Sequence, residues 1–138
     1  MSTIVAAVLL RTQIADALVL RGDEFLVRNK LVQAQVHYQR ALWFDDTSTA
    51  AVDRTIYVAM LQRGRAELKN AITLASAFLR RFPEDDVVRA DRGLCYLLVK
   101  KYRLAAKDYD RTAADTHDLQ TRIFAHRLDS IARSDPHR

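Results

Sequence analysis

The sequence predicts an all-α protein that forms one compact domain over residues 1–138, and three observations support this prediction. Apolar residues recur at helical spacing along almost the whole chain, and the strict alternation of a β-strand is nearly absent. The chain is 49% apolar but has only three glycines and two prolines, too few for the turns of an all-β fold. Short polar clusters interrupt it repeatedly. We therefore expect about seven helices of roughly a dozen residues, paired as antiparallel hairpins.

The helices follow from the polar clusters that mark the turns between them. These clusters are residues 28–30, 45–49, 63–65, 82–85, 99–101 and 115–117. Thr47 or Ser48 can cap the helix that follows, because a hydroxyl accepts a hydrogen bond from a free backbone N–H. Pro83 suits a helix start, where its missing N–H is not needed. Asp115 or Thr116 can cap the last helix.

Small residues recur in pairs that lie twelve residues apart. The pairs are Gly22 and Ala34, Ala59 and Ala71, and Gly93 and Ala105. Tyr38 and Ala41 follow the first pair, Tyr109 and Thr112 follow the third at the same offsets, and the second has Ala75 and Phe78 there. A small residue on each helix of a hairpin lets the backbones approach, and the aromatic side chain fills the space beside the crossing. Three stacked hairpins are expected, because one hairpin cannot cover its own apolar faces.

These residues resemble the tetratricopeptide repeat (TPR), a helix-turn-helix unit of 34 residues. The first copy has Leu18, Gly22, Phe25, Ala34, Tyr38 and Ala41 at the motif positions, and the third has Gly93, Tyr96, Ala105 and Tyr109. In the second copy Ala59, Ala71 and Pro83 fit, whereas Gln62 and Ala75 replace two aromatic residues.

The resemblance implies a right-handed superhelical array of about three hairpins. The repeats would cover about 15–48, 52–85 and 86–119, with a three-residue insertion at 49–51. An N-terminal helical extension would precede them. A capping helix at about 117–133 would follow, and its apolar residues at helical spacing are Leu119, Ile123, Leu128 and Ile131.

The composition argues against disulfides, metal sites, phosphate-binding loops and catalytic sets. The single Cys95 excludes an internal disulfide and a closed Cys/His zinc site. The scattered glycines exclude a phosphate-binding loop. The four histidines have no partners at the spacing of metal ligands or of a catalytic set. We expect no cofactor, no metal and no enzymatic activity.

The N-terminal segment holds the longest apolar run, Ile4 to Leu10. This run is far short of the roughly 20 residues of a membrane-spanning helix, so we expect no membrane span. No positive charge precedes it and no cleavage site follows it, which argues against a secretory signal and favours the cytoplasm.

The net charge of +5 comes from 22 basic and 17 acidic residues that are mixed along most of the chain. The densest basic cluster is Lys100, Lys101, Arg103, Lys107 and Arg111, and Asp108 and Asp110 interrupt it. Nucleic-acid contact through Lys100, Lys101, Arg103 and Lys107 is a candidate, but a solvated surface of mixed charge is favoured. Nucleic acid is therefore an improbable partner.

The TPR resemblance implies that the first helix of each repeat lines a concave groove that holds the ligand. The candidate partner-binding residues are Val19, Asp23, Leu26, Val27, Ile56, Met60, Arg63, Leu94, Leu97 and Leu98. Most are apolar. The clamp of Lys and Asn that the family uses for terminal carboxylates is not expected, because Val19 and Asp23 stand where two clamp residues would be.

These features predict a non-catalytic scaffold, adaptor or small chaperone that binds an apolar helix or peptide of a partner protein in its groove. Two alternatives stay open. One is a basic helical subunit of a nucleoprotein complex. The other is a self-associating structural subunit, a homo-oligomer, whose groove is filled by a second copy or by the chain's own Ile4–Leu10 helix.

Overall fold

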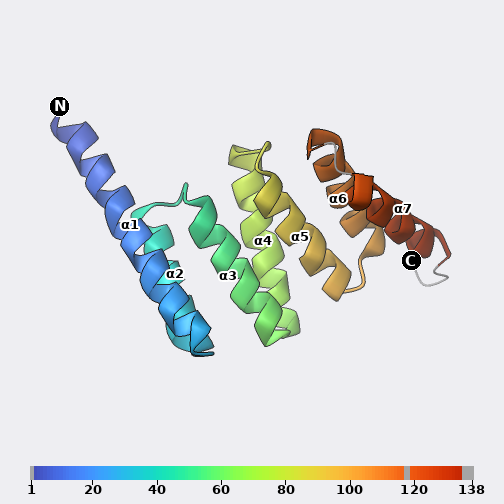
Figure 1. Ribbon diagram of the computed structural model, residues 1–138, viewed down its shortest axis with the longest axis horizontal. Coiled ribbons are helices and arrows are strands. Elements are labelled where there is room, and N and C mark those ends of the chain that lie inside the picture. Colours follow the sequence, from blue (N-terminus) through green and yellow to red (C-terminus); the bar gives the residue numbers. More distant parts are fainter. Residues whose placement is uncertain (1, 117–118, 135–138) are drawn as a thin grey trace. The chain divides into compact units, whose positions relative to one another are not determined.

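The computed structural model describes residues 2–116 and 119–134, and within these ranges it contains seven α-helices (Figure 1). The helices are α1 (Thr3–Val27), α2 (Leu31–Phe44), α3 (Thr49–Gln62), α4 (Arg65–Arg81), α5 (Asp86–Leu98), α6 (Tyr102–Thr116) and α7 (Leu119–Ser134). The predicted all-α helical repeat is therefore confirmed. The chain divides into two compact units, Met1–Val58 and Ala59–Arg138, and the division falls within α3.

The helix starts show which of the expected caps form. The Ser48 hydroxyl accepts a hydrogen bond from the backbone N–H of Ala51 at 3.2 Å, as predicted. Helix α5 begins at Asp86 and not near Pro83, and Asp85 caps it, because the Asp85 carboxylate accepts a hydrogen bond from the N–H of Val88 at 3.0 Å. Pro83 lies earlier, in the loop. The backbone of Asp115 and Thr116 belongs to α6, so neither begins α7.

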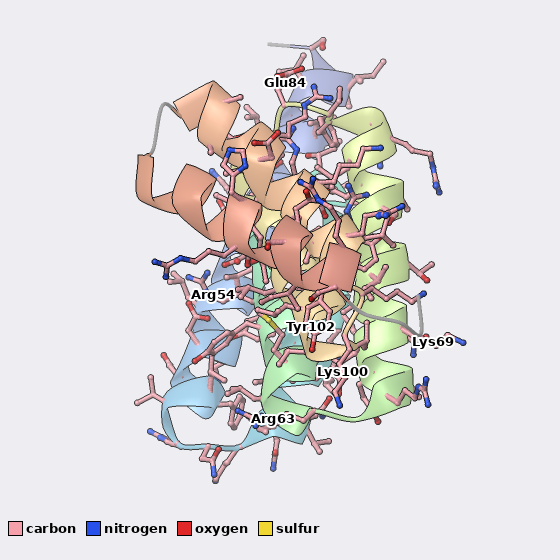
Figure 2. The ribbon with its side chains drawn as sticks, turned by 90° about the vertical axis from the view of Figure 1, so that its right-hand side faces the viewer. Arg54, Arg63, Lys69, Glu84, Lys100 and Tyr102 are labelled. Carbon is pink, nitrogen blue, oxygen red and sulfur yellow. The ribbon has the colours of Figure 1, made fainter. Side chains whose placement is uncertain are left out.

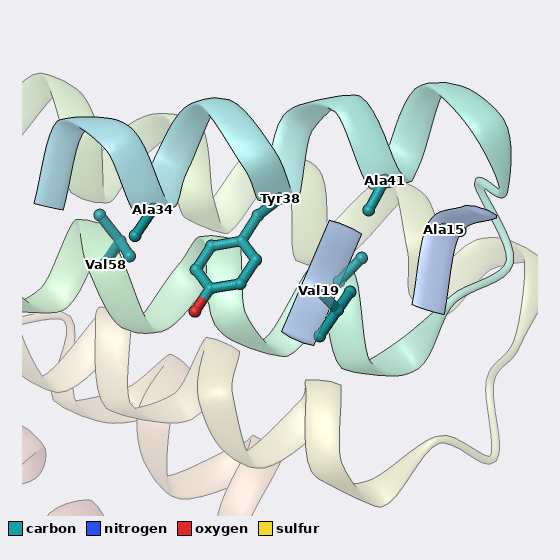
Figure 3. Close-up of a cluster of buried hydrophobic side chains, with 7 residues drawn as sticks. Ala15, Val19, Ala34, Tyr38, Ala41 and Val58 are labelled. Carbon is teal, nitrogen blue, oxygen red and sulfur yellow. The ribbon is translucent and has the colours of Figure 1, made fainter. Parts of the chain in front are cut away.

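In the first unit, Gly22 of α1 lies directly against the ring of Tyr38 of α2. A Cβ atom at Gly22 would be 2.5 Å from Cε1 of Tyr38, so only glycine fits without a shift of the ring. The core around this contact is formed by Ala15, Val19, Ala34, Tyr38, Ala41, Ala51 and Val58, from α1, α2 and α3 (Figure 3). The predicted role of Gly22 in letting the two helices approach is confirmed.

The second unit repeats this contact between α5 and α6. A Cβ atom at Gly93 would be 3.0 Å from Cε2 of Tyr109. The core beside it consists of Ala105, Ala106, Tyr109 and Leu128, with Tyr96, Leu97 and Tyr102 partly buried against it. Leu128 comes from α7, so the C-terminal helix covers the apolar face of α6 as expected of a cap. Leu119 and Ile123 belong to α7, but their side chains are outside the described part.

The turns inside the three hairpins correct the expected register of the second copy. Asn29, Arg63 and Lys100 each adopt a left-handed conformation there, with φ between 57° and 62°. Asn29 and Arg63 are 34 positions apart, whereas Arg63 and Lys100 are 37 apart. The three extra residues therefore lie in α4, which has 17 residues against 14 in α2, and not around residues 49–51.

The same comparison changes the role of Ala59. Gly22 and Gly93 lie seven positions before their turn residues, whereas Ala59 lies only four before Arg63. The residue seven before Arg63 is Ile56, which is fully buried. Ala59 and Ala71 are therefore twelve residues apart, like the other two pairs, but Ala59 does not occupy the position in its hairpin that Gly22 and Gly93 occupy in theirs.

The N-terminal part of α1 is apolar and uncovered. Arg11 donates hydrogen bonds to the carbonyls of Phe44 (3.0 Å) and Trp43 (3.1 Å), which ties α1 to the end of α2. Before this point all large apolar side chains are exposed, namely Ile4, Val5, Val8, Leu9 and Leu10, at 47–77%. The Ile4–Leu10 segment is thus a straight continuation of α1 that does not fold back into a groove.

By length and composition α1 could cross a membrane, since an 18-residue window in it has a mean hydropathy of 1.7. The expectation of no membrane span considered only unbroken apolar runs and missed this window. However, Ala15, Val19 and Gly22 are buried in the hairpin with α2. The segment before Arg11, Thr3–Leu10, is by itself about 12 Å of helix against a hydrocarbon layer of roughly 30 Å.

Candidate functional site

Helix α5 carries an exposed apolar face in the second unit. Val87, Leu94 and Leu98 are 50%, 39% and 42% exposed. Their spacings of seven and four residues place all three on one side of the helix. Ala90, half-buried, lies on the same side. The arrangement is a stripe of aliphatic side chains that is open to water. We call Val87, Leu94 and Leu98 the α5 face.

The other residues of this unit that are predicted to bind a partner differ in their exposure to solvent. Leu97 is packed against the core formed by α6 and α7, so it supports the fold rather than the open surface. Met60 is half-buried near the end of α3. Arg63 is exposed, in the left-handed turn between α3 and α4. Of the three partner-binding candidates in α5, Leu94 and Leu98 are therefore the exposed ones, whereas Leu97 is partly buried.

In the first unit the structure removes several candidates from the surface. Val19 is 6% exposed and Ile56 is fully buried, although the sequence predicts both on an open strip. Leu26 packs against the core of this unit. Val27, in contrast, is 88% exposed at the end of α1. Val19 and Ile56 are interior because the first helices also supply the side chains that fill the hairpins.

Asp23, another candidate, is held in a polar network between α1, α2 and α3. Its Oδ1 atom accepts hydrogen bonds from the Tyr38 hydroxyl at 2.6 Å and from Nε of Arg54 at 3.1 Å. Arg54 also pairs with Asp53 at 2.6 Å. Burial, together with the hydrogen bond to Asp23, raises the pKa of Tyr38. Asp23 therefore anchors the ring that covers Gly22, which is a structural role.

The basic cluster is split between a turn and one helix face. Lys100 and Lys101 lie at the turn between α5 and α6, where Lys100 and Tyr102 appear together in Figure 2. Arg103, Lys107 and Arg111 follow at intervals of four along α6 and share one side of it. Asp110 is interspersed among them. The nucleic-acid candidates thus form no continuous track of positive charge.

Asp108, which interrupts the cluster in sequence, points inward and forms a bidentate ion pair with Arg92 of α5. The Arg92 Nε and Nη2 atoms donate to its two oxygens at 2.8 and 2.6 Å. The pair was missed at the sequence level, because the partners are sixteen residues apart on two different helices.

In the part of the chain that the structure describes, the residues that could carry chemistry are not gathered into a metal-binding group. Cys95 is fully buried in α5, and this burial, reinforced by Asp91, raises the pKa of its thiol to about 12. The thiol is therefore neutral at physiological pH and a poor nucleophile. Within residues 2–116 and 119–134, no group of three or more His, Cys, Asp or Glu side chains could hold a metal ion.

Solved structures identify the fold, although no family model matches the sequence and no curated protein does. The first TPR domain of Spaghetti (RPAP3), bound to the HSP90 peptide SRMEEVD, has a TM-score of 0.77 at 14% identity, over 89% of this chain and 96% of that one. The first TPR domain of human RPAP3 gives 0.77 and 14%, over 89% and 95%. The Arabidopsis OM64 TPR domain gives 0.74 and 11%, over 87% and 98%. The chain therefore has a TPR-like fold.

Proposed function

We propose that the protein is a non-catalytic scaffold, an adaptor or small chaperone of the cytoplasm, that binds an apolar segment of a partner protein on the α5 face. The exposure of Val87, Leu94 and Leu98 carries this proposal. A helical repeat fold whose relative holds a peptide of HSP90 is suited to a protein ligand. Most of the binding residues that the sequence predicts in the first unit are instead packed inside that unit.

The chemistry of the α5 face favours an aliphatic ligand. Each partner side chain that displaces water from it contributes on the order of 1.5–3 kcal/mol, before the cost of ordering the segment. Spacings of seven and four match one side of an amphipathic helix, so a partner helix can lie along α5 and make contacts on successive turns.

The test replaces Leu94 and Leu98 by glutamine, which removes the apolar surface without changing the charge. The probe is a fluorescein-labelled amphipathic helical peptide with a leucine stripe and an uncharged polar face, followed by fluorescence anisotropy. The double variant should bind at least about tenfold more weakly, because two apolar anchors are lost.

The matched control replaces Leu20 and Ile131 by glutamine, since both are exposed apolar residues on helices other than α5. It should bind as the wild type does. Equal loss in both double variants would show adsorption to any apolar surface and would contradict the proposal. Circular dichroism confirms that each variant keeps its helices.

Self-association is a second candidate function, and the uncovered start of α1 favours it. A helix segment that is apolar on all sides is usually buried, and here Ile4, Val8 and Leu10 are each more than half exposed. Light scattering should show a mass that rises with protein concentration. Replacing Ile4 and Val8 by glutamine should restore the monomer mass, whereas a wild type that is monomeric throughout would rule this function out.

A further inference from the structure

A cavity of about 330 Å³ opens in the second unit, between α4, α5 and α6. It lies on the opposite side of α5 from the α5 face. Arg92 and Tyr96, which line the cavity, are each two positions from Leu94 and therefore about 160° away around the helix. The two surfaces are thus separate sites on one helix.

The Arg92 guanidinium forms a fixed cation in the wall of this cavity. Two of its nitrogens donate to Asp108, and Nη1 donates to the Ser76 hydroxyl at 3.3 Å. A guanidinium has five N–H donors, so two remain for a ligand. The side chain is 23% exposed, whereas Asp108 is 6% exposed. The carboxylate is buried behind the guanidinium, which stays partly open.

The cavity has more positive charge than its acidic neighbours balance. Arg92 is paired with Asp108, and Arg89 with Asp86 at 2.7 Å. Arg111 is only 3.6 Å from Glu84, and both side chains are more than half exposed, which makes a weak pair.

Two further cations line the cavity from two different helices. Arg80 lines it from α4 and Lys107 from α6, and both are exposed. Across the described ranges, neither makes an ion pair. The site therefore has about two unbalanced positive charges among its lining residues, which also include the Arg92 guanidinium with its free donors.

The walls are also partly apolar. Leu79, Pro83 and Leu104 line the same cavity, and Leu104 is 41% exposed. A bare inorganic anion would leave Pro83 and Leu104 in contact with water. A ligand that carries both a carboxylate and an aliphatic group satisfies both kinds of wall.

We propose that this cavity binds an acidic segment of a partner protein, with a glutamate or aspartate between Arg80 and Lys107 and an adjacent apolar side chain against Leu79 and Leu104. A carboxylate there accepts hydrogen bonds from the free donors of Arg92 as well. The partly apolar lining fits a peptide better than a nucleic-acid backbone, which needs a continuous cationic track. The proposal does not depend on the α5 face.

The experiment measures binding of a fluorescein-labelled peptide of alternating glutamate and leucine, by anisotropy at low and at physiological ionic strength. Replacing Arg80 and Lys107 by glutamine should weaken binding about tenfold and reduce its dependence on salt. The matched control replaces Arg65 and Lys69, two exposed cations of α4 outside the cavity, and removes the same charge. It should weaken binding less than twofold.

Several outcomes would overturn the proposal. Equal losses in the two double variants would show attraction by net charge alone. A peptide with glutamine in place of glutamate that binds equally well would show that the cations are not used. Tighter binding of an oligothymidine, reduced by the Arg80 and Lys107 substitutions, would assign the surface to nucleic acid. Loss of binding in the Leu94→Gln/Leu98→Gln variant alone would assign the peptide to the α5 face.

Discussion

Replacing Gly22 with alanine should lower the free energy of unfolding by about 2 kcal/mol, although alanine is the better helix former by roughly 1 kcal/mol. The new methyl group would lie 2.5 Å from Cε1 of Tyr38, well inside van der Waals contact. The ring cannot swing away, because Tyr38 is fully buried and its hydroxyl is bound to Asp23. The helices α1 and α2 must therefore separate, which opens the core of the first unit.

Urea denaturation followed by circular dichroism measures this change, and the fluorescence of Trp43, the single tryptophan, reports on the first unit. Gly93→Ala is the matched control. Its methyl group would be 3.0 Å from the ring of Tyr109, so a small shift suffices and the net effect should stay within about 0.5 kcal/mol. Adding Tyr38→Leu to Gly22→Ala should cost less than the two changes cost separately. Strict additivity would mean that the ring does not determine the helix separation.

Gly22 and Gly93 could be interpreted correctly from the sequence because each is paired with a tyrosine on the next helix. Tyr38 and Tyr109 follow them at the same distance, so two independent residues support one geometry. Ala59 had only the interval to Ala71 in its favour. An alanine is common in any helix, and one interval without its aromatic partner does not fix the register of a hairpin. The register of the second hairpin follows from the position of its turn residue, Arg63. The positive φ that marks this turn in the structure has no signal in the sequence when the residue is an arginine.

The exposure of the candidate site was harder to predict than its place on the helices. Val19, Ile56 and Leu94 are all aliphatic residues of first helices, yet two are interior and one is exposed. Periodicity gives the face of a helix but not what packs against it. Asp23 was placed on a binding surface because its position in the first helix matches a groove position of the TPR pattern, whereas its partners, Tyr38 and Arg54, come from two other helices.

The cavity beside α5 was missed for a related reason. Arg80, Arg92 and Lys107 belong to three helices, and a search for basic clusters along the sequence separates them. That search grouped Lys107 with Lys100, Lys101, Arg103 and Arg111, its neighbours in sequence, and not with Arg80 and Arg92. The available signal was Asp108, an acid within a basic run on the side of α6 that carries Ala105 and Thr112. A charge on a core-facing side predicts a buried partner.

Asp108→Ala should destabilise the protein by roughly 3 kcal/mol, because it removes one partner of a buried ion pair and leaves the other. Asp108 is 6% exposed and accepts two hydrogen bonds from Arg92. Without it the guanidinium keeps the Ser76 hydroxyl and the ring of Tyr96, 5.8 Å away, but no anionic partner. Urea denaturation of the full chain measures the loss.

The double variant Arg92→Met/Asp108→Leu separates the cost of an unpaired charge from the net worth of the pair. It removes both charges and keeps an apolar volume, so it should be more stable than Asp108→Ala. The exposed pair Arg111 and Glu84 is the control, and Arg111→Ala should change the stability by less than about 0.5 kcal/mol. A loss below about 1 kcal/mol for Asp108→Ala would mean that Arg92 reaches solvent freely. The cavity would then have no fixed cation in its wall, because it is the buried carboxylate that orients the guanidinium toward a ligand.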